Sequence, residues 1–240
     1  MSVYNEVIVQ DPVEAIVFDG TDAKFFGCTQ EGTITQTVDQ TELICGIGSK
    51  VKAILNKSKM INFSVQMGVH VSDFIAYNSG VSMTSGSRDI WKNEKVLAAT
   101  TTGVTCTITG TPKGGTVYVT DIYGKTFVGT YAAGVVTITS GVAGDYYNIM
   151  YQETTADVDQ VDLDVNSFPS DLHVQLHTIA YDEDGDAILA DIYWDFPKAV
   201  PDGNINESFT GDAKVSTIGF KAIDDGTGSY GTYMIIERTA

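Results

Sequence analysis

Apolar and polar residues alternate most regularly between Lys59 and Met67. The apolar positions are Ile61, Phe63, Val65 and Met67, and the polar ones between them are Asn62, Ser64 and Gln66. This period of two predicts a strand with one face on a core. Residues 50–55 are also rich in strand formers, and Asn56-Lys57 offers a turn back into Lys59. The pattern therefore predicts a hairpin between residues 50–55 and 59–67.

A short helix is expected directly after this strand. Ser72 is a suitable N-terminal cap for a helix over residues 73–78. Gly80 can end that helix, because glycine adopts the left-handed conformation without steric cost. A long strand followed by a short helix is thus the layout that organises the first part of the chain.

Other segments have the same strand-like character. Residues 33–38 alternate, and the acidic stretch 39–42 is expected to end that strand. Residues 171–180 and 188–196 alternate on either side of a tight turn, which predicts an antiparallel hairpin. The last strand, residues 230–236, is apolar on both faces near its end, which is typical of a central strand.

The middle of the chain predicts a separate module. Short strand-like segments, punctuated by glycine-containing turns, have the spacing of a small sandwich; they are residues 105–108, 116–119, 126–128, 135–138 and 147–151. Residues 97–155 are therefore expected to form an inserted β-sandwich, joined through the acidic connector 154–164 to a main β-domain of residues 1–96 and 156–240. The predicted fold class is all-β, with a sandwich or barrel as the main domain and one short helix.

The hairpin, short helix and Gly80 together resemble the major tail tube proteins of long-tailed bacteriophages. A second match runs from Phe196-Pro197-Lys198-Ala199 through Pro201-Asp202-Gly203-Asn204 to residues 216–223 and the last strand. The resemblance implies a virion protein that forms hexameric rings, stacked into a tube through which phage DNA passes, with other tail proteins as partners. The inserted module resembles the immunoglobulin-like modules of phage virion proteins, although it has no Cys–Trp–Cys pattern.

Composition narrows the class of protein further. The chain has 240 residues, 43% of them hydrophobic, with 24 glycines. No run of 18 apolar residues exists and the N-terminus has no signal-like core, so we expect a protein made in the host cytoplasm that does not enter a membrane. Cys28, Cys45 and Cys106 have no metal-like spacing and are expected to be buried thiols.

The charge of −17 is distributed unevenly along the chain. Between Lys125 and Lys198 there are thirteen acidic residues and no Lys or Arg, so tight binding to DNA is not expected. In contrast, Lys50, Lys52, Lys57 and Lys59 lie on the predicted central hairpin. These lysines are either a solvated tip or contacts between subunits that meet acidic loops of the next ring.

Candidate sites for chemistry are weak. Residues 182–186 (Asp-Glu-Asp-Gly-Asp) resemble the start of a calcium loop but lack the later bidentate Glu, so a simple turn is expected. His173 and His177 share a strand face about 13 Å apart, too far for one metal ion. His70 is expected to pack or cap near the helix. No catalytic motif appears, so we expect no enzyme activity and no cofactor.

Two functions follow from these patterns. The first is a structural tail tube subunit that assembles through its sheets and the lysine-bearing hairpin. The alternative is a virion decoration or surface protein whose inserted module binds carbohydrate. Aromatic residues of that module could stack on sugar rings; they are Tyr118, Tyr123, Tyr131, Tyr146 and Tyr147.

Overall fold

The computed structural model describes residues 8–9, 14–27, 29–45, 50–100, 104–182, 184, 187–205 and 215–238. Cys28, Glu183, Gly185 and Asp186, which enter the sequence-based expectations, lie outside these residues. The chain forms two compact units. Unit 1 comprises Met1–Met83 and Val161–Ala240, and unit 2 is Thr84–Gln160.

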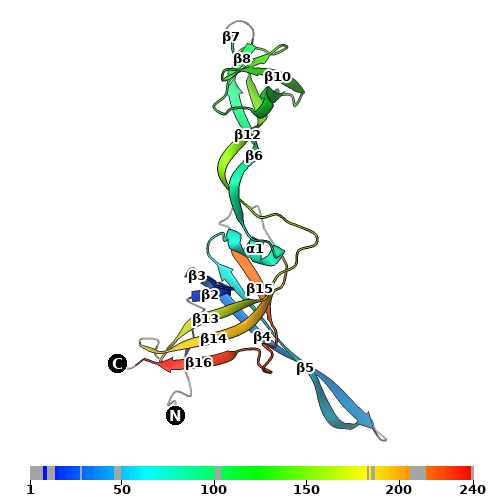
Figure 1. Cartoon of the computed structure of the whole chain (residues 1–240), viewed down its shortest axis with the longest axis vertical. Helices are drawn as coiled ribbons and strands as arrows, with labels where there is room; N and C mark the ends of the chain where they lie inside the picture. The colour runs from blue at the N-terminus through cyan, green and yellow to red at the C-terminus, as the bar shows by residue number, and fades with distance from the viewer. Residues whose placement is uncertain are drawn as a thin grey trace. The chain divides into compact units, whose positions relative to one another are not determined.

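Unit 1 is built on a nine-stranded sheet with one helix (Figure 1). Its elements are β1 (Ile8–Val9), β2 (Glu14–Asp19), β3 (Asp22–Phe26), β4 (Thr29–Cys45), β5 (Lys50–Met67), α1 (Ser72–Ser79), β13 (Leu172–Tyr181), β14 (Ile188–Pro201), β15 (Ser216–Ala222) and β16 (Thr232–Glu237). The strand order is β3-β2-β13-β14-β15-β5-β4, with β1 on β13 and β16 on β14. These elements confirm the all-β class with a short helix.

Strand β14 makes the sheet fold over its own core. On one side it pairs with β13, and on the other with β16 near its start and with β15 only at Ala199–Pro201. Strands β15, β5 and β4 therefore cross the β13–β14 layer (Figure 1). Between the layers, the ring of Phe63 stacks on those of Phe196 and Phe220, with centroids 4.3 and 5.0 Å apart.

The alternation predicted for residues 61–67 is confirmed. Phe63, Val65 and Met67 are buried, and Ile61 packs against the same core. The predicted hairpin between residues 171–180 and 188–196 is also confirmed as β13 and β14.

Helix α1 confirms one predicted end and corrects the other. Gly80 ends the helix in the left-handed region, with φ of 69°. A Cβ at Gly80 would lie 2.1 Å from the carbonyl oxygen of Phe168, so only glycine fits. At the start, however, Val71 is the N-cap and no side chain caps the helix. Ser72 is already helical, and the Val71 N–H instead donates to the hydroxyl of Ser216, which also lies 3.3 Å from Nδ1 of His70.

The predicted turn at Asn56-Lys57 is wrong. Strand β5 runs without interruption and pairs with β4, so residues 39–42 do not end a strand either. Asp39 lies opposite Ser58 and Gln40 opposite Asn56, which leaves Lys57 as an extra residue in a β-bulge. The reason is that Asn56-Lys57 contains no glycine for a tight hairpin turn, whereas β4 offers backbone partners along the whole of β5.

The last strand is also placed differently from the prediction. Among the described strands, β16 pairs with β14 alone, and Ile235 and Ile236 are exposed rather than central. An apolar run on both faces can therefore mark a strand left uncovered in the subunit as well as one buried within it.

Unit 2 has its own sheet and core. Its elements are β6 (Thr84–Leu97), β7 (Ala99–Thr100), β8 (Val104–Thr107), a 3-10 turn (Lys113–Gly115), β9 (Thr116–Thr120), β10 (Thr126–Ala132), β11 (Val135–Ile138) and β12 (Tyr146–Gln160). The order is β6-β12-β9-β10-β11-β8-β7. Each segment that the turn spacing predicted to be a strand forms one in the structure.

The ends of unit 2 lie outside the predicted limits of 97 and 155. Strands β6 and β12 pair from Leu97 and Tyr146 back to Thr84 and Gln160, as a long ribbon (Figure 1). The first half of the expected acidic connector is thus strand β12. The immunoglobulin-like character of this unit stays a prediction.

No helix in the described part of the chain is long and apolar enough to span a membrane.

Candidate assembly surface

The far part of the β4–β5 pair, here called the hairpin tip, comprises residues 38–45 and 50–60. It extends beyond the rest of unit 1 (Figure 1), and its large apolar side chains are exposed: Val38, Leu43, Ile44, Val51, Ile54, Leu55 and Met60. Ile54, for example, has 56% of its surface exposed. Contiguous exposed apolar side chains of this kind mark interaction sites in soluble proteins.

The strand register places these side chains on both faces of the tip. Residues directly opposite each other share a face, and faces alternate along a strand. One face therefore carries the pairs Val38–Lys59, Glu42–Ile54 and Ile44–Val51, and the other carries Thr37–Met60, Thr41–Leu55 and Leu43–Ala53. A partner on one side alone would leave the other apolar row in water.

The four lysines are all exposed on the tip but do not form one patch. Lys59 lies opposite Val38 and Lys50 opposite Cys45; these β4 positions are an odd number of residues apart, so the two lysines lie on opposite faces. Lys57 and Lys52 are the extra residues of two bulges. Strand β4 also brings Asp39 and Glu42 beside them, which the predicted hairpin did not include. The role of the lysines in assembly stays a prediction.

Strand β16 is a second exposed apolar element. Tyr233, Ile235 and Ile236 are exposed, and Arg238 holds the end of the strand to the sheet. The Arg238 guanidinium donates to both oxygens of Asp191 at 2.7 Å. Together with a weaker contribution from His177, these bonds lower the pKa of Asp191 to about 2.

The two strand histidines have separate acidic partners. Nε2 of His173 lies 2.6 Å from Asp195, and His177 lies 2.8 Å from Asp191 and 3.2 Å from Glu14. Their rings stack on Phe18 and Tyr193, respectively. They therefore belong to a side-chain network on the outer face of β13, and each imidazole has its own carboxylates rather than a ligand in common.

The expected turn at residues 182–186 is described only in part. The backbone N–H of Asp182 donates to the carbonyl of Ala187 at 3.0 Å, and the Ala187 N–H donates to the Asp182 carboxylate. Among the described residues, no group of three or more His, Cys, Asp or Glu could hold a metal ion.

Cys106 is buried, and burial raises the pKa of its thiol. Cys45 is exposed on the tip, so the expectation of buried thiols is wrong for it.

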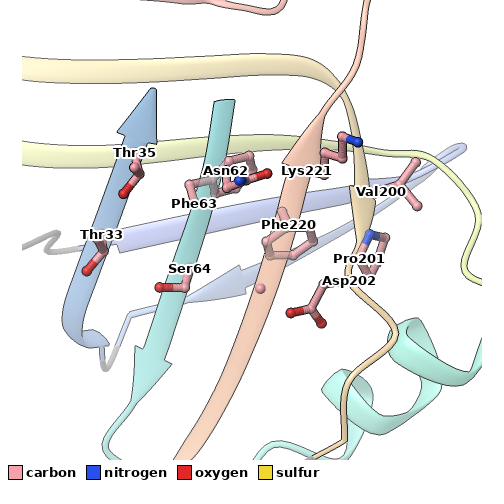
Figure 2. A pocket seen from close by; sticks show the side chains of 11 residues that line it. Thr33, Thr35, Asn62, Phe63, Ser64, Val200, Pro201, Asp202, Phe220 and Lys221 are labelled. Atoms are coloured by element: carbon pink, nitrogen blue, oxygen red, sulfur yellow. The ribbon is translucent and has the colours of Figure 1, made fainter. Parts of the chain in front are cut away.

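A groove of about 610 Å³ lies over β4, β5 and β15 (Figure 2). Its polar lining consists of small hydroxyl and amide side chains and one charge of each sign: Thr33, Thr35, Asn62, Ser64, Asp202 and Lys221. A Cβ at Gly219 would meet the Asp202 carboxylate at 2.5 Å, so glycine lets the loop approach β15 closely. The groove is a polar outer surface of the same strands whose inner side chains form the core.

The five tyrosines of unit 2 divide between core and surface. Tyr147 is buried and its hydroxyl accepts a hydrogen bond from the Val142 N–H at 2.8 Å. Tyr131 packs against the unit 2 core. Tyr118, Tyr123 and Tyr146 are exposed. One further aromatic residue of this unit, Trp91, is 60% exposed, and the centroid of its ring lies 5.8 Å from that of Tyr118.

The features most prominent in unit 1 are thus extended strands that leave apolar side chains in water. Such surfaces are typical of structural proteins that form interfaces through their sheets.

Comparison with known proteins identifies this class more closely. The model of the YomU/Tube protein family matches residues 7–236, so the chain belongs to this family. The chain is also 25% identical over 232 residues to the "Tail tube protein" of Bacillus phage SPR, a match that covers 92% of this chain and 85% of the relative. These findings confirm the resemblance to phage tail tube proteins, which are structural components of the virion and not enzymes.

Proposed function

We propose that the protein is a tail tube subunit that assembles with itself into stacked rings around a channel for phage DNA. The observation that carries the proposal is the hairpin tip, which exposes apolar rows on both of its faces. Removal of apolar surface from water contributes about 25 cal/mol per Å². A tip held between two neighbouring subunits would bury both rows and gain this contribution on each face.

The hexameric ring is the arrangement that the family resemblance implies. Heterologous contacts, in which one surface of a subunit binds a different surface of the next, generate closed rings. The tip and the exposed strand β16 are two such different surfaces on one subunit. They supply both halves of a repeating contact, and other tail proteins can use the same surfaces at the ends of the tube.

The charge of the chain suits a channel for DNA. With a net charge of −17, the subunit repels the phosphate backbone rather than binding it. Phage DNA would then pass without tight contacts. The tip lysines contribute a second, electrostatic component to assembly by meeting acidic segments of a neighbouring ring.

The test substitutes apolar residues on both faces of the tip at once. In the double variant Ile54→Gln and Leu55→Gln, one apolar side chain is lost from each face. We expect the wild-type protein at high concentration to form rings or tubes in electron micrographs and to sediment rapidly, and the variant to stay monomeric with an unchanged circular dichroism spectrum.

A matched control replaces two equally exposed apolar residues of unit 2, Ile122 and Val142, with Gln. This control should assemble like the wild type. If the tip variant also forms tubes, the tip is not the main contact.

The inserted unit supports a second function, the binding of carbohydrate on the virion surface. The observation that favours it is the exposure of Trp91 beside Tyr118. Retardation of the full chain in a native gel that contains polysaccharide tests this function.

A further inference from the structure

Strands β6, β12, β9 and β10 place three large exposed side chains side by side on the outer face of unit 2. Asn93 lies opposite Met150, Met150 opposite Tyr118, and Tyr118 opposite Val128. Trp91 precedes Asn93 by two positions and thus shares its face. Tyr118 and Val128 are exposed together with Trp91. We call the surface formed by Trp91, Asn93, Tyr118, Val128, Tyr146 and Asn148 the Trp91 face.

We propose that the Trp91 face is a binding platform for a neutral polysaccharide chain. The inference rests on the proposed carbohydrate-binding function of unit 2 and assigns its site and ligand class. A sugar ring has an apolar face and a rim of hydroxyls. It therefore suits a surface that alternates aromatic rings with short amide and hydroxyl side chains.

The aromatic part of the platform is accessible and not needed by the core. The core of unit 2 lies behind the opposite side of the same strands, where Val117, Val119 and Ile149 are buried. Trp91 and Tyr118 have centroids 5.8 Å apart and planes inclined at 44°, which gives a tilted pair of rings rather than a closed stack. Both rings keep surface in water that a ligand can cover.

Polar groups of the right kind lie between the two aromatic ends. Tyr146 marks the other end, with the Lys95 ammonium 5.2 Å from its ring centroid. From Tyr146 to Gln152 along β12 is about 20 Å at the usual rise per residue, which is room for several sugar units. Asn148 lies within this stretch opposite Lys95, and Thr120 lies opposite Asn148 on β9.

The charge of the face decides the class of polysaccharide. Among its outward residues on β6 (91–97), β9 (116–120), β10 (126–130) and β12 (146–152), Lys95 is the single charged side chain. Asp89, beyond Trp91, is already paired with Lys113 and accepts a hydrogen bond from Thr154. An anionic polymer would require several cations along its path, so an uncharged chain is the better match.

The test uses the full chain in native gels that contain hydroxyethyl cellulose, laminarin or dextran as neutral probes and alginate as the anionic probe. We expect wild-type protein to be retarded by at least one neutral probe. Trp91→Ala and Tyr118→Ala should each weaken that binding about tenfold or more, because a central aromatic contact is lost. Tyr123→Ala is the control: Tyr123 is 86% exposed but lies in the turn after β9, off the face.

Each other outcome overturns the proposal in a distinguishable way. If the wild type binds none of the neutral probes, the carbohydrate function fails together with the site. If Trp91→Ala and Tyr118→Ala bind as tightly as the wild type, carbohydrate binding stands and the site is wrong. If only alginate binds, and salt abolishes the effect, the assignment of a neutral ligand is wrong. Circular dichroism of every variant separates lost binding from lost fold.

Discussion

The two parts of the β4–β5 hairpin differ although the same two strands form both. In the root, residues 61–67, one face is buried against Phe196 and Phe220 and the other carries small polar side chains. In the tip, residues 38–45 and 50–60, apolar side chains occur on both faces and are exposed. The apolar residues of the root are thus buried within the subunit, whereas those of the tip are exposed and can be covered by another surface.

This difference shows how one strand can serve two purposes. Alternation of apolar and polar residues is what a sheet with one covered face requires. Where β5 extends beyond the core, the alternation of apolar and polar residues stops and bulges occur at Lys57 and Lys52. The same change occurs at Ile235 and Ile236 in β16. Four predictions test or sharpen the contrast.

The largest effect is expected from a truncation in the root. Phe63→Ala removes a ring that stacks on two others in the core and should lower the free energy of unfolding by about 3–5 kcal/mol. The matched tip variant Ile54→Ala should change it by no more than about 0.5 kcal/mol, because Ile54 is exposed in the subunit. Urea unfolding of the monomer measures both; similar losses would show that the tip is packed in the subunit.

The charge of the tip should affect assembly more than folding. Replacing Lys50, Lys52, Lys57 and Lys59 with Glu removes contacts worth about 0.2–1 kcal/mol each as exposed pairs. We expect the variant to assemble poorly while its monomer stays folded. Wild-type assembly should weaken in 1 M salt, where the Debye length is about 3 Å. Sedimentation at several salt concentrations checks this, and a variant with wild-type tubes and salt response would contradict it.

Removal of unit 2 should leave both parts of the hairpin unchanged. Thr84 lies opposite Gln160 in the ribbon, so Met83 and Val161 can be joined by a short Gly/Ser linker. Because unit 1 has its own core, we expect its free energy of unfolding to change by about 1 kcal/mol or less. Chemical denaturation and electron microscopy of the shortened protein measure folding and assembly. Insoluble protein would show that unit 1 depends on unit 2.

The smallest effect concerns the attachment of β16. The pKa of Asp191 is lowered from 3.8 to about 2 in the folded protein. The contribution of the ionised Asp191 carboxylate to the stability of the folded protein is therefore complete above about pH 4. It is lost as the pH falls through about 2. Arg238→Ala should destabilise the protein only slightly at pH 7, since the exposed guanidinium is screened by solvent. The difference from the wild type should vanish near pH 2 in urea titrations; a constant difference would exclude the ion pair as its cause.

The sequence alone was sufficient to predict those structural features whose physical cause is local. Alternation at Ile61–Met67 predicted the buried face of β5, and the glycine-containing turns predicted the short strands of unit 2. The end of α1 at Gly80 was predicted from its freedom to adopt positive φ, and the structure adds that Phe168 leaves no space for a side chain there. The family resemblance was confirmed by comparison, although the hairpin on which it was partly based is one continuous strand, β5.

The tertiary structure decided which strands are partners and therefore which faces are covered. Pairing of β4 with β5 turned an expected turn at Asn56-Lys57 into a bulge and put Lys50 and Lys59 on opposite faces. The last strand left Ile235 and Ile236 exposed, and Trp91 became part of an open sheet face. The residue pattern gives each strand a period, but a period does not specify its neighbour. The neighbour depends on contacts between segments that are distant in the chain, and these set the burial of every side chain.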